Sequence, residues 1–299
     1  MNKILICICF ALALGVLLFA VLKKDAPIAP LPNRPLPQPQ PIQEPPQPEP
    51  EPEPEPVWPI WLHEPPLRNV TGLGEVLNDI EGHMPAGHIY KDSDKITWGH
   101  ETTHGIHSRL RQKYSQSGAF STSLNGKQYF KSFDRINCFY VLENRAIKLK
   151  EPNTTLAEVA KNVPRSLRGN VYNLYLIKQQ RYWNNEPLYI FDEWVAYGNG
   201  ACVKNDLDIK NRVGTVRYAL EFNVYAMTLA MTAKTDDPHF KSFLMWNLAR
   251  TMTLYKINDP TTHQKEYLEK MRWHHDGEEL RRYIRGYCGT EWTQKILGF

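Results

Sequence analysis

The chain has 299 residues, of which 42% are hydrophobic, and its 15 Tyr, 11 Phe and 8 Trp are ample for one well-filled core. Its net charge is only +4, and Lys and Arg are scattered singly, without a basic stripe interleaved with aromatic residues. This distribution argues against a nucleic-acid partner. The length allows one or two domains.

The cysteines show no metal-binding spacing. Cys7 and Cys9 lie in an apolar N-terminal run, whereas Cys138, Cys202 and Cys288 are spread through the rest of the chain with no Cys-x-x-Cys pair. A structural zinc site built from thiolates is therefore not expected. In an oxidising compartment two of the last three could pair, and Cys202 with Cys288 is the pair that we consider.

Residues 1–24 are predicted to form an N-terminal transmembrane anchor. Ile4 to Leu22 is an unbroken run of 19 apolar residues, flanked by Lys3 and by Lys23 and Lys24. A helix of that length spans a hydrocarbon core of about 30 Å. The alternative is a cleaved signal peptide, but its apolar core is usually only about 7–15 residues and ends in a small-x-small site, which this run lacks. The flanking charges do not set the orientation.

Residues 25–66 are predicted to be a proline-rich linker. Residues 26–66 hold 17 of the 23 prolines, and Pro48 to Pro56 alternates proline with glutamate. Proline at every second position favours extended polyproline II and leaves too few donors for a helix or sheet. About 30 such residues reach on the order of 90 Å. The segment resembles the stalk of TonB-type proteins, which implies a spacer between a membrane and a domain. An SH3- or WW-type ligand is the alternative.

Residues 67–299 are predicted to form a helix-dominated α+β domain. Apolar spacing predicts a helix over Asp94 to Tyr114, with Ser93 or Asp94 as its N-cap. Further helices are expected over residues 155–162, 172–183, 192–201, 217–235, 240–255 and 262–287. The expected strands are residues 130–133, 136–142 and 188–191, where β-branched and aromatic residues gather.

One pentapeptide carries recognisable chemistry: His100-Glu101-Thr102-Thr103-His104. On a helix, residues four apart differ by about 40° around the axis, so both imidazoles face one point and can bind one zinc ion. Glu101 is rotated by about 100° from His100, which suits a general base acting on a metal-activated water better than a ligand. His107 shares the same face, but it lies about 10 Å from His100 along the axis, so it is expected beside the site or on the surface.

This motif resembles the zincin superfamily of metallopeptidases, and within it the gluzincins. The resemblance covers only residues 100–104 and one later glutamate. It implies a zinc cofactor, a helix-lined cleft, a helical C-terminal part, hydrolysis of peptide bonds, and a third zinc ligand that is a glutamate on a later helix. The chain departs from the metzincin extension, because His107 and Leu110 stand where that branch has glycine and histidine.

Two glutamates begin the Glu-x-x-Ala pattern that the third ligand would need, Glu143 and Glu193. The shorter spacing from His104 favours Glu143. Glu193 lies in an almost wholly apolar run, however, where a carboxylate is costly to bury unless it is paired or bound to metal. We therefore choose Glu193 and keep Glu143 as the alternative. Three neighbours are expected to assist: Asp192 by orienting a zinc-bound histidine, and Tyr197 or Tyr189 by hydrogen-bonding the oxyanion.

These features together predict a membrane-anchored zinc metallopeptidase that acts on a protein or peptide substrate. Its catalytic domain is expected outside the cytoplasm, in a periplasm or the extracellular space. The alternative is a non-catalytic extracytoplasmic binding or scaffold protein on a zincin-like fold. A cell-wall hydrolase is ranked last, because the usual zinc enzymes of that class do not use this motif.

Overall fold

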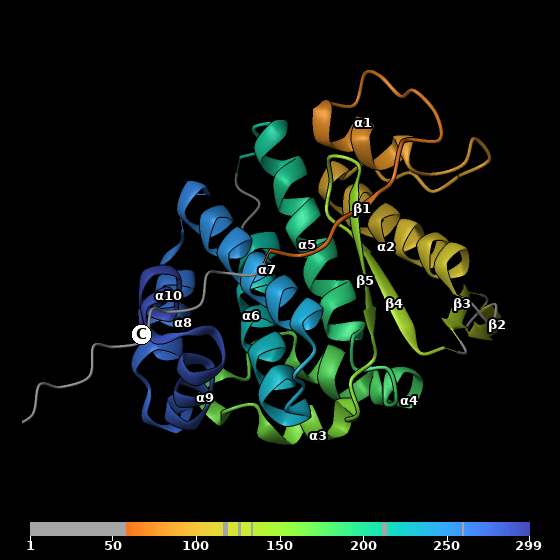
Figure 1. Ribbon diagram of the computed structural model, residues 1–299. Helices are drawn as coiled ribbons and strands as arrows, with labels where there is room; N and C mark the ends of the chain where they lie inside the picture. Colours follow the sequence, from red (N-terminus) through yellow and green to blue (C-terminus); the bar gives the residue numbers. More distant parts are fainter. Residues whose placement is uncertain (1–57, 116–118, 125–126, 133, 211–213, 259) are drawn as a thin grey trace, which may run out of the picture. The chain divides into compact units, whose positions relative to one another are not determined.

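Four long helices lie side by side in the order α2 (Lys95–Tyr114), α5 (Tyr189–Asp206), α6 (Gly214–Ala233) and α7 (Pro238–Ile257) (Figure 1). The computed structural model describes residues 58–299 except 116–118, 125–126, 133, 211–213 and 259. The predicted anchor and most of the predicted linker lie outside the described residues. Within the described part, no helix is long and apolar enough to cross a membrane.

Local capping explains where these helices begin. The Asp94 side chain accepts a hydrogen bond from the Ile96 backbone N–H at the start of α2, which confirms the predicted cap. Asp237 caps α7 in the same way, and Pro238 occupies the first turn, where no backbone donor is needed. The described domain is helix-dominated α+β, as predicted.

A small antiparallel sheet packs against α2 and α5. Its strand order is β1 (Leu62–His63), β5 (Arg145–Lys150) and β4 (Ile136–Tyr140), and a separate hairpin pairs β2 (Ala119–Leu124) with β3 (Lys127–Ser132). The strands expected near residues 130 and 136 are present. The strand expected over residues 188–191 is wrong, because this run forms the start of α5. All of its side chains are buried, so the run has no alternation of apolar and polar residues that would separate a strand from a buried helix.

Shorter elements complete the described domain. α1 (Glu75–Gly82) packs on α2, and α3 (Leu156–Asn162) packs on α6. A 3₁₀ turn (Arg165–Leu167), a π-helix labelled η2 (Asn173–Lys178) and α4 (Gln180–Trp183) lead into α5. After α7, the helices α8 (Thr262–Trp273), α9 (Glu278–Cys288) and α10 (Thr290–Ile296) pack against α6 and α7 (Figure 1).

The single helix predicted over residues 262–287 is wrong, because the chain breaks between α8 and α9. Asp276, in the short turn between them, accepts hydrogen bonds from the backbone and hydroxyl of Ser166, 110 positions earlier. His274 also donates to this carboxylate. A contact so distant in sequence leaves no trace in local periodicity.

The packed domain begins before Leu67, inside the range predicted as linker. Trp61 packs edge-on against Trp246 of α7, with ring centroids 4.8 Å apart. Glu64 is 1% exposed, and its carboxylate accepts a hydrogen bond from Lys113 Nζ at 2.8 Å. β1 therefore joins the last part of the predicted linker to the sheet and to α2.

The close approach of α2 and α5 depends on Gly99. A Cβ at this position would lie 2.8 Å from Val203 Cγ2 of α5, closer than a side chain tolerates. Asn199 of α5 fixes the pair, since its amide donates to Thr103 Oγ1 on α2 at 3.2 Å. Arg250 of α7 donates to Asn199 Oδ1 at 2.7 Å. The two helices that carry the predicted site are thus held at short range by a buried hydrogen bond between them.

Cys138, Cys202 and Cys288 are free thiols, so the Cys202–Cys288 disulfide is not formed. Burial raises the pKa of the Cys138 and Cys288 thiols to about 12. Both therefore stay protonated at neutral pH, and neither is placed to act as a thiolate ligand.

A buried carboxyl at the end of β5 predicts a pH-dependent stability. Glu151 is 6% exposed, accepts a hydrogen bond from the Leu188 backbone N–H at 2.9 Å, and has a pKa raised by burial to about 8. Between its ordinary pKa of about 4.5 and about 8, the unfolded chain has released this proton whereas the folded chain retains it. Stability therefore falls as pH rises through that window.

Glu151→Gln keeps an acceptor and removes this ionisation. We expect the variant to exceed wild type in unfolding free energy at pH 8 by on the order of a few kcal/mol, and the difference to vanish near pH 4.5. Urea unfolding at several pH values measures it, with the exposed Glu279→Gln as control. A constant difference between the two proteins across this range would contradict the assignment.

Candidate metal centre

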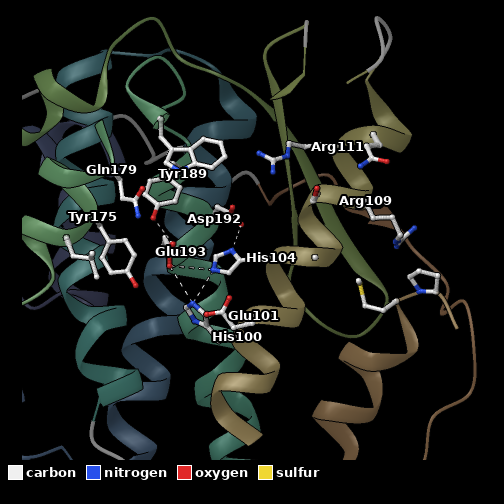
Figure 2. Close-up of a pocket in the computed structure, with 17 residues that line it drawn as sticks. His100, Glu101, His104, Arg109, Arg111, Tyr175, Gln179, Tyr189, Asp192 and Glu193 are labelled. Carbon is white, nitrogen blue, oxygen red and sulfur yellow. Dashed lines mark hydrogen bonds and ion pairs between the residues drawn. The ribbon is translucent and has the colours of Figure 1, made fainter. Parts of the chain in front are cut away.

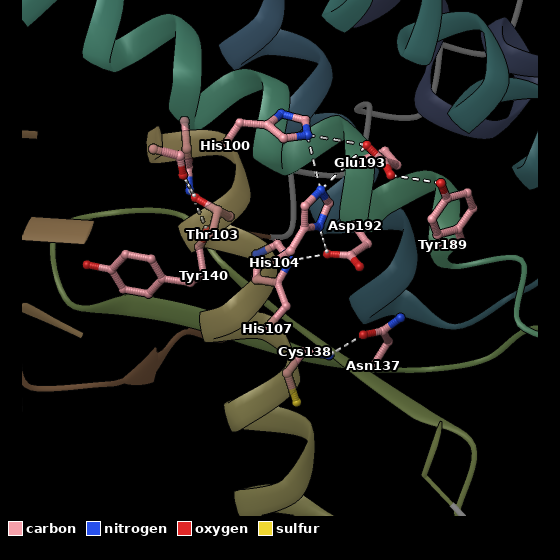
Figure 3. Close-up of polar contacts among 12 residues, drawn as sticks. His100, Thr103, His104, His107, Asn137, Cys138, Tyr140, Tyr189, Asp192 and Glu193 are labelled. Atoms are coloured by element: carbon pink, nitrogen blue, oxygen red, sulfur yellow. Dashed lines mark hydrogen bonds and ion pairs between the residues drawn. The ribbon is translucent and has the colours of Figure 1, made fainter. Parts of the chain in front are cut away.

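The predicted ligands come together between α2 and α5. His100 and His104, one turn apart on α2, point toward Glu193, the fifth residue of α5 (Figure 3). All three side chains are largely buried, with 12%, 24% and 9% of their surface exposed. The four-residue spacing on α2 places the two imidazoles on one face of the helix, and the close packing of α5 places the Glu193 carboxylate opposite them.

The distances fit one tetrahedral metal ion. The Nε2 atoms of His100 and His104 lie 3.1 Å apart, and Glu193 Oε2 lies 3.6 Å from each of them. Ligand atoms about 2.0–2.1 Å from a tetrahedral zinc ion lie roughly 3.3–3.4 Å from one another. Glu193 Oε2 is buried and has no hydrogen-bond partner among the described residues. A carboxylate oxygen that binds a metal ion would have no other partner, so a buried oxygen without a hydrogen bond is expected at such a site when the metal is absent.

The other oxygen of Glu193 is held in place. The Tyr189 hydroxyl donates to Glu193 Oε1 at 2.8 Å. Burial opposes ionisation of this carboxyl, but the neighbouring His104 and His100 rings outweigh it and lower its pKa to about 2. Tyr189, expected from the sequence as an oxyanion donor, donates to the Glu193 carboxylate in this structure.

Asp192 fixes the orientation of the histidines. Its Oδ1 accepts from His104 Nδ1 at 3.1 Å and also from His107 Nδ1. When Nδ1 of His104 carries the proton, its Nε2 is free to bind a metal ion. Asp192 thus takes the supporting position expected for it, on the far side of His104 from Glu193 (Figure 3).

His104, His107 and Asp192 form a second group whose ligand atoms are also close together. Here the carboxylate oxygen already accepts two hydrogen bonds, whereas Glu193 Oε2 accepts none. His107 is fully buried, so it lies beside the candidate ligand triangle of His100, His104 and Glu193 and not on the surface. The chemistry of the two groups therefore favours His100, His104 and Glu193 as the ligand set.

Glu101 is exposed and lies beside His100 at the edge of a cavity of about 600 Å³ (Figure 2). His100, His104, Asp192 and Glu193 line the same cavity. A carboxylate that faces the cavity next to the ligand triangle, without joining it, has the position of a general base.

Tyr175 is a cavity residue that the sequence did not single out. It projects from the π-helix η2 into the cavity, and its hydroxyl lies 2.6 Å from that of Tyr197. Tyr197, one of the two predicted oxyanion donors, packs its ring on His100 at 4.4 Å. Residues 172–183 were expected as an ordinary α-helix, and the π-helical turn that directs Tyr175 has no simple sequence signal.

Glu143, the alternative third ligand, lies elsewhere. It occupies the turn between β4 and β5 with φ 55°, its side chain is 76% exposed, and it pairs with Arg145 at 2.7 Å. No metal-ligating group that includes Glu143 occurs among the described residues. The Glu-x-x-Ala pattern indicates a metal ligand only on a helix, where the alanine lies one turn after the glutamate, and Glu143 lies in a turn.

Gly105, which follows His104, leaves room for a neighbouring side chain. A Cβ there would meet Met84 Cε at 2.9 Å, so the Met84 side chain lies over this turn of α2. Met84 also lines the cavity. The glycine thus makes room for an apolar cavity wall.

Comparison with known protein families, with curated proteins and with solved structures found no match to this chain. Function is therefore inferred from the geometry and chemistry of the site itself.

Proposed function

We propose that this chain is a zinc metallopeptidase of the His-Glu-x-x-His type with a zincin-like catalytic domain. One observation carries the proposal: His100, His104 and Glu193 bring three candidate ligand atoms within 3.6 Å of one another at a cavity that Glu101 also faces. Two imidazoles and one carboxylate are a known donor set of catalytic zinc, which keeps one position open.

The proposed reaction is hydrolysis of a peptide bond. A zinc ion held by His100, His104 and Glu193 would supply Lewis acidity toward the carbonyl and would lower the pKa of a water molecule. Glu101 accepts a proton from the attacking water and delivers it to the leaving amine. Tyr175, which lines the cavity, donates to the negative charge that develops on the carbonyl oxygen. Tyr189 and Asp192 keep Glu193 and His104 oriented throughout.

Zinc analysis together with a cleavage assay tests this function. We expect the purified full-length protein to hold about one zinc ion per chain and to cleave a denatured protein. A chelator should abolish cleavage, and added zinc should restore it. Bound zinc without cleavage of any protein or peptide would favour the alternative, a non-catalytic binding or scaffold protein.

We also propose that residues 1–24 anchor the chain in a membrane and that the proline-rich segment holds the catalytic domain outside the cytoplasm. The support is the 19-residue apolar run and the prolines that follow it. Carbonate-washed membranes should retain the protein with its N-terminal peptide intact. A mature chain that begins near Ala26 would identify a cleaved signal peptide instead.

A further inference from the structure

Arg111 is a buried cation in the candidate active-site cavity, and its Nε has no partner among the described residues. It lies in the last turns of α2, is 5% exposed and lines the cavity. Its Nε is fully buried and has no hydrogen-bond partner among the residues that the structure describes. Such a group is costly to bury unless something satisfies it.

The position of Arg111 relates it directly to the metal-ligand triangle. It follows His104 by seven residues, so two turns of helix return it to within about 20° of the same face. The rise between the two residues is about 10 Å. Figure 2 shows its guanidinium directed toward the side of the cavity formed by Asp192 and Tyr189, whereas Arg109 points the opposite way.

The carboxyls near Arg111 do not neutralise it. Asp192 already accepts from His104 and His107. Glu151 accepts a hydrogen bond from the Leu188 backbone N–H. Burial raises the pKa of this carboxyl to about 8, so Glu151 is mostly protonated at neutral pH and carries little negative charge to offset Arg111. The guanidinium therefore offers its donors to the cavity.

We propose that Arg111 is the anion-binding group of this cavity and holds a carboxylate of the bound peptide. The peptide as ligand rests on the proposed peptidase function. A guanidinium presents a planar fork of donors that matches a carboxylate, and a desolvated pair of this kind is strong. Arg111 lies about 10 Å along α2 from His104. An extended peptide spans about 3.3–3.6 Å per residue, so the carboxylate is expected within about three residues of the cleaved bond. It is either the C-terminal carboxylate or an Asp or Glu side chain.

Binding measurements separate these two sources. The probes are dansylated alanine hexapeptides of three kinds: with a free C-terminus, with an amidated C-terminus, and amidated with one Glu placed at each position in turn. Fluorescence anisotropy on the full-length Glu101→Gln protein measures their affinity without turnover. We expect either the free acid or one Glu peptide to bind roughly 10–100-fold more tightly than the all-alanine amide.

Arg111→Met, which keeps the length of the side chain, should erase this preference, and Arg111→Lys should retain part of it. Arg109 lines the same cavity, and its Nε and Nη2 are likewise buried without a described partner. Arg109→Met therefore tests the other arginine of this helix, and it should leave the preference intact because the Arg109 guanidinium points away from Asp192 and Tyr189. Circular dichroism and zinc content establish that each variant is folded. If Arg111→Met does not fold, the acid-against-amide comparison and Arg111→Lys still decide the matter.

Equal affinity of all three peptide kinds would overturn the proposal, as would a preference lost in Arg109→Met but kept in Arg111→Met. Cleavage of denatured protein is scored separately. Cleavage without carboxylate preference removes the Arg111 site and leaves the peptidase. An Arg111-dependent preference without cleavage supports the site and removes the peptidase.

Discussion

Replacement of Glu101 by Gln is expected to lower kcat for peptide hydrolysis by about 100-fold or more, while zinc content stays near that of wild type. General acid–base groups typically contribute about 10²–10⁴-fold to rate. Gln has the same shape but cannot accept the proton. Glu101 lies outside the ligand triangle and is exposed to the cavity, so its loss should disturb neither the metal nor the fold.

Steady-state rates on a denatured protein and zinc analysis of the same preparations measure this effect. Glu101→Asp is the matched variant: it keeps the carboxylate and withdraws it by one methylene, so its rate should fall between those of the wild type and Glu101→Gln. Near-normal turnover in Glu101→Gln would exclude this residue as the base. Loss of zinc in that variant would indicate that Glu101 is a ligand.

Glu193→Ala is expected to release zinc and abolish activity, whereas Glu143→Ala should retain both. A catalytic zinc site needs three protein ligands, and metal held by His100 and His104 alone would bind far more weakly. Glu193 Oε2 lies 3.6 Å from both Nε2 atoms. Glu143 is solvent-exposed and bound to Arg145, so its removal costs only a surface ion pair.

Zinc stoichiometry after dialysis against a weak chelator, measured on both variants, separates the two glutamates. Thermal unfolding with and without zinc provides the control, because only a protein that binds the metal is stabilised by it. The choice of Glu193 is refuted by full zinc and full activity in Glu193→Ala. Zinc loss in Glu143→Ala would reinstate the alternative ligand.

The part of the site that depends on one helix was accessible from the sequence. The spacing of His100 and His104 and the cap at Asp94 are local signals, and the structure places both on α2. Glu193 required a different argument, namely that a carboxylate in an apolar run needs a partner. The same apolar run misled the strand assignment of residues 188–191, since burial on all sides erases the period that separates strand from helix.

Features set by distant contacts were not accessible. The break between α8 and α9 follows from Asp276 binding Ser166, and the cavity wall at Tyr175 follows from a π-helix. Arg111 is an instructive intermediate case. The seven-residue spacing from His104 already places Arg111 on the same face of the predicted helix. Only the structure shows that this side chain is buried and that its Nε has no described partner.

β1 and Glu64 have a mechanical consequence. The chain enters the domain at Trp61 and β1, which contact Trp246 of α7 and pair with β5, so a pull on the preceding residues would load these contacts. Glu64 passes part of that load to Lys113 and Tyr114 at the end of α2. The helix that carries His100 and His104 is therefore one of the elements on which tension in the proposed linker would act.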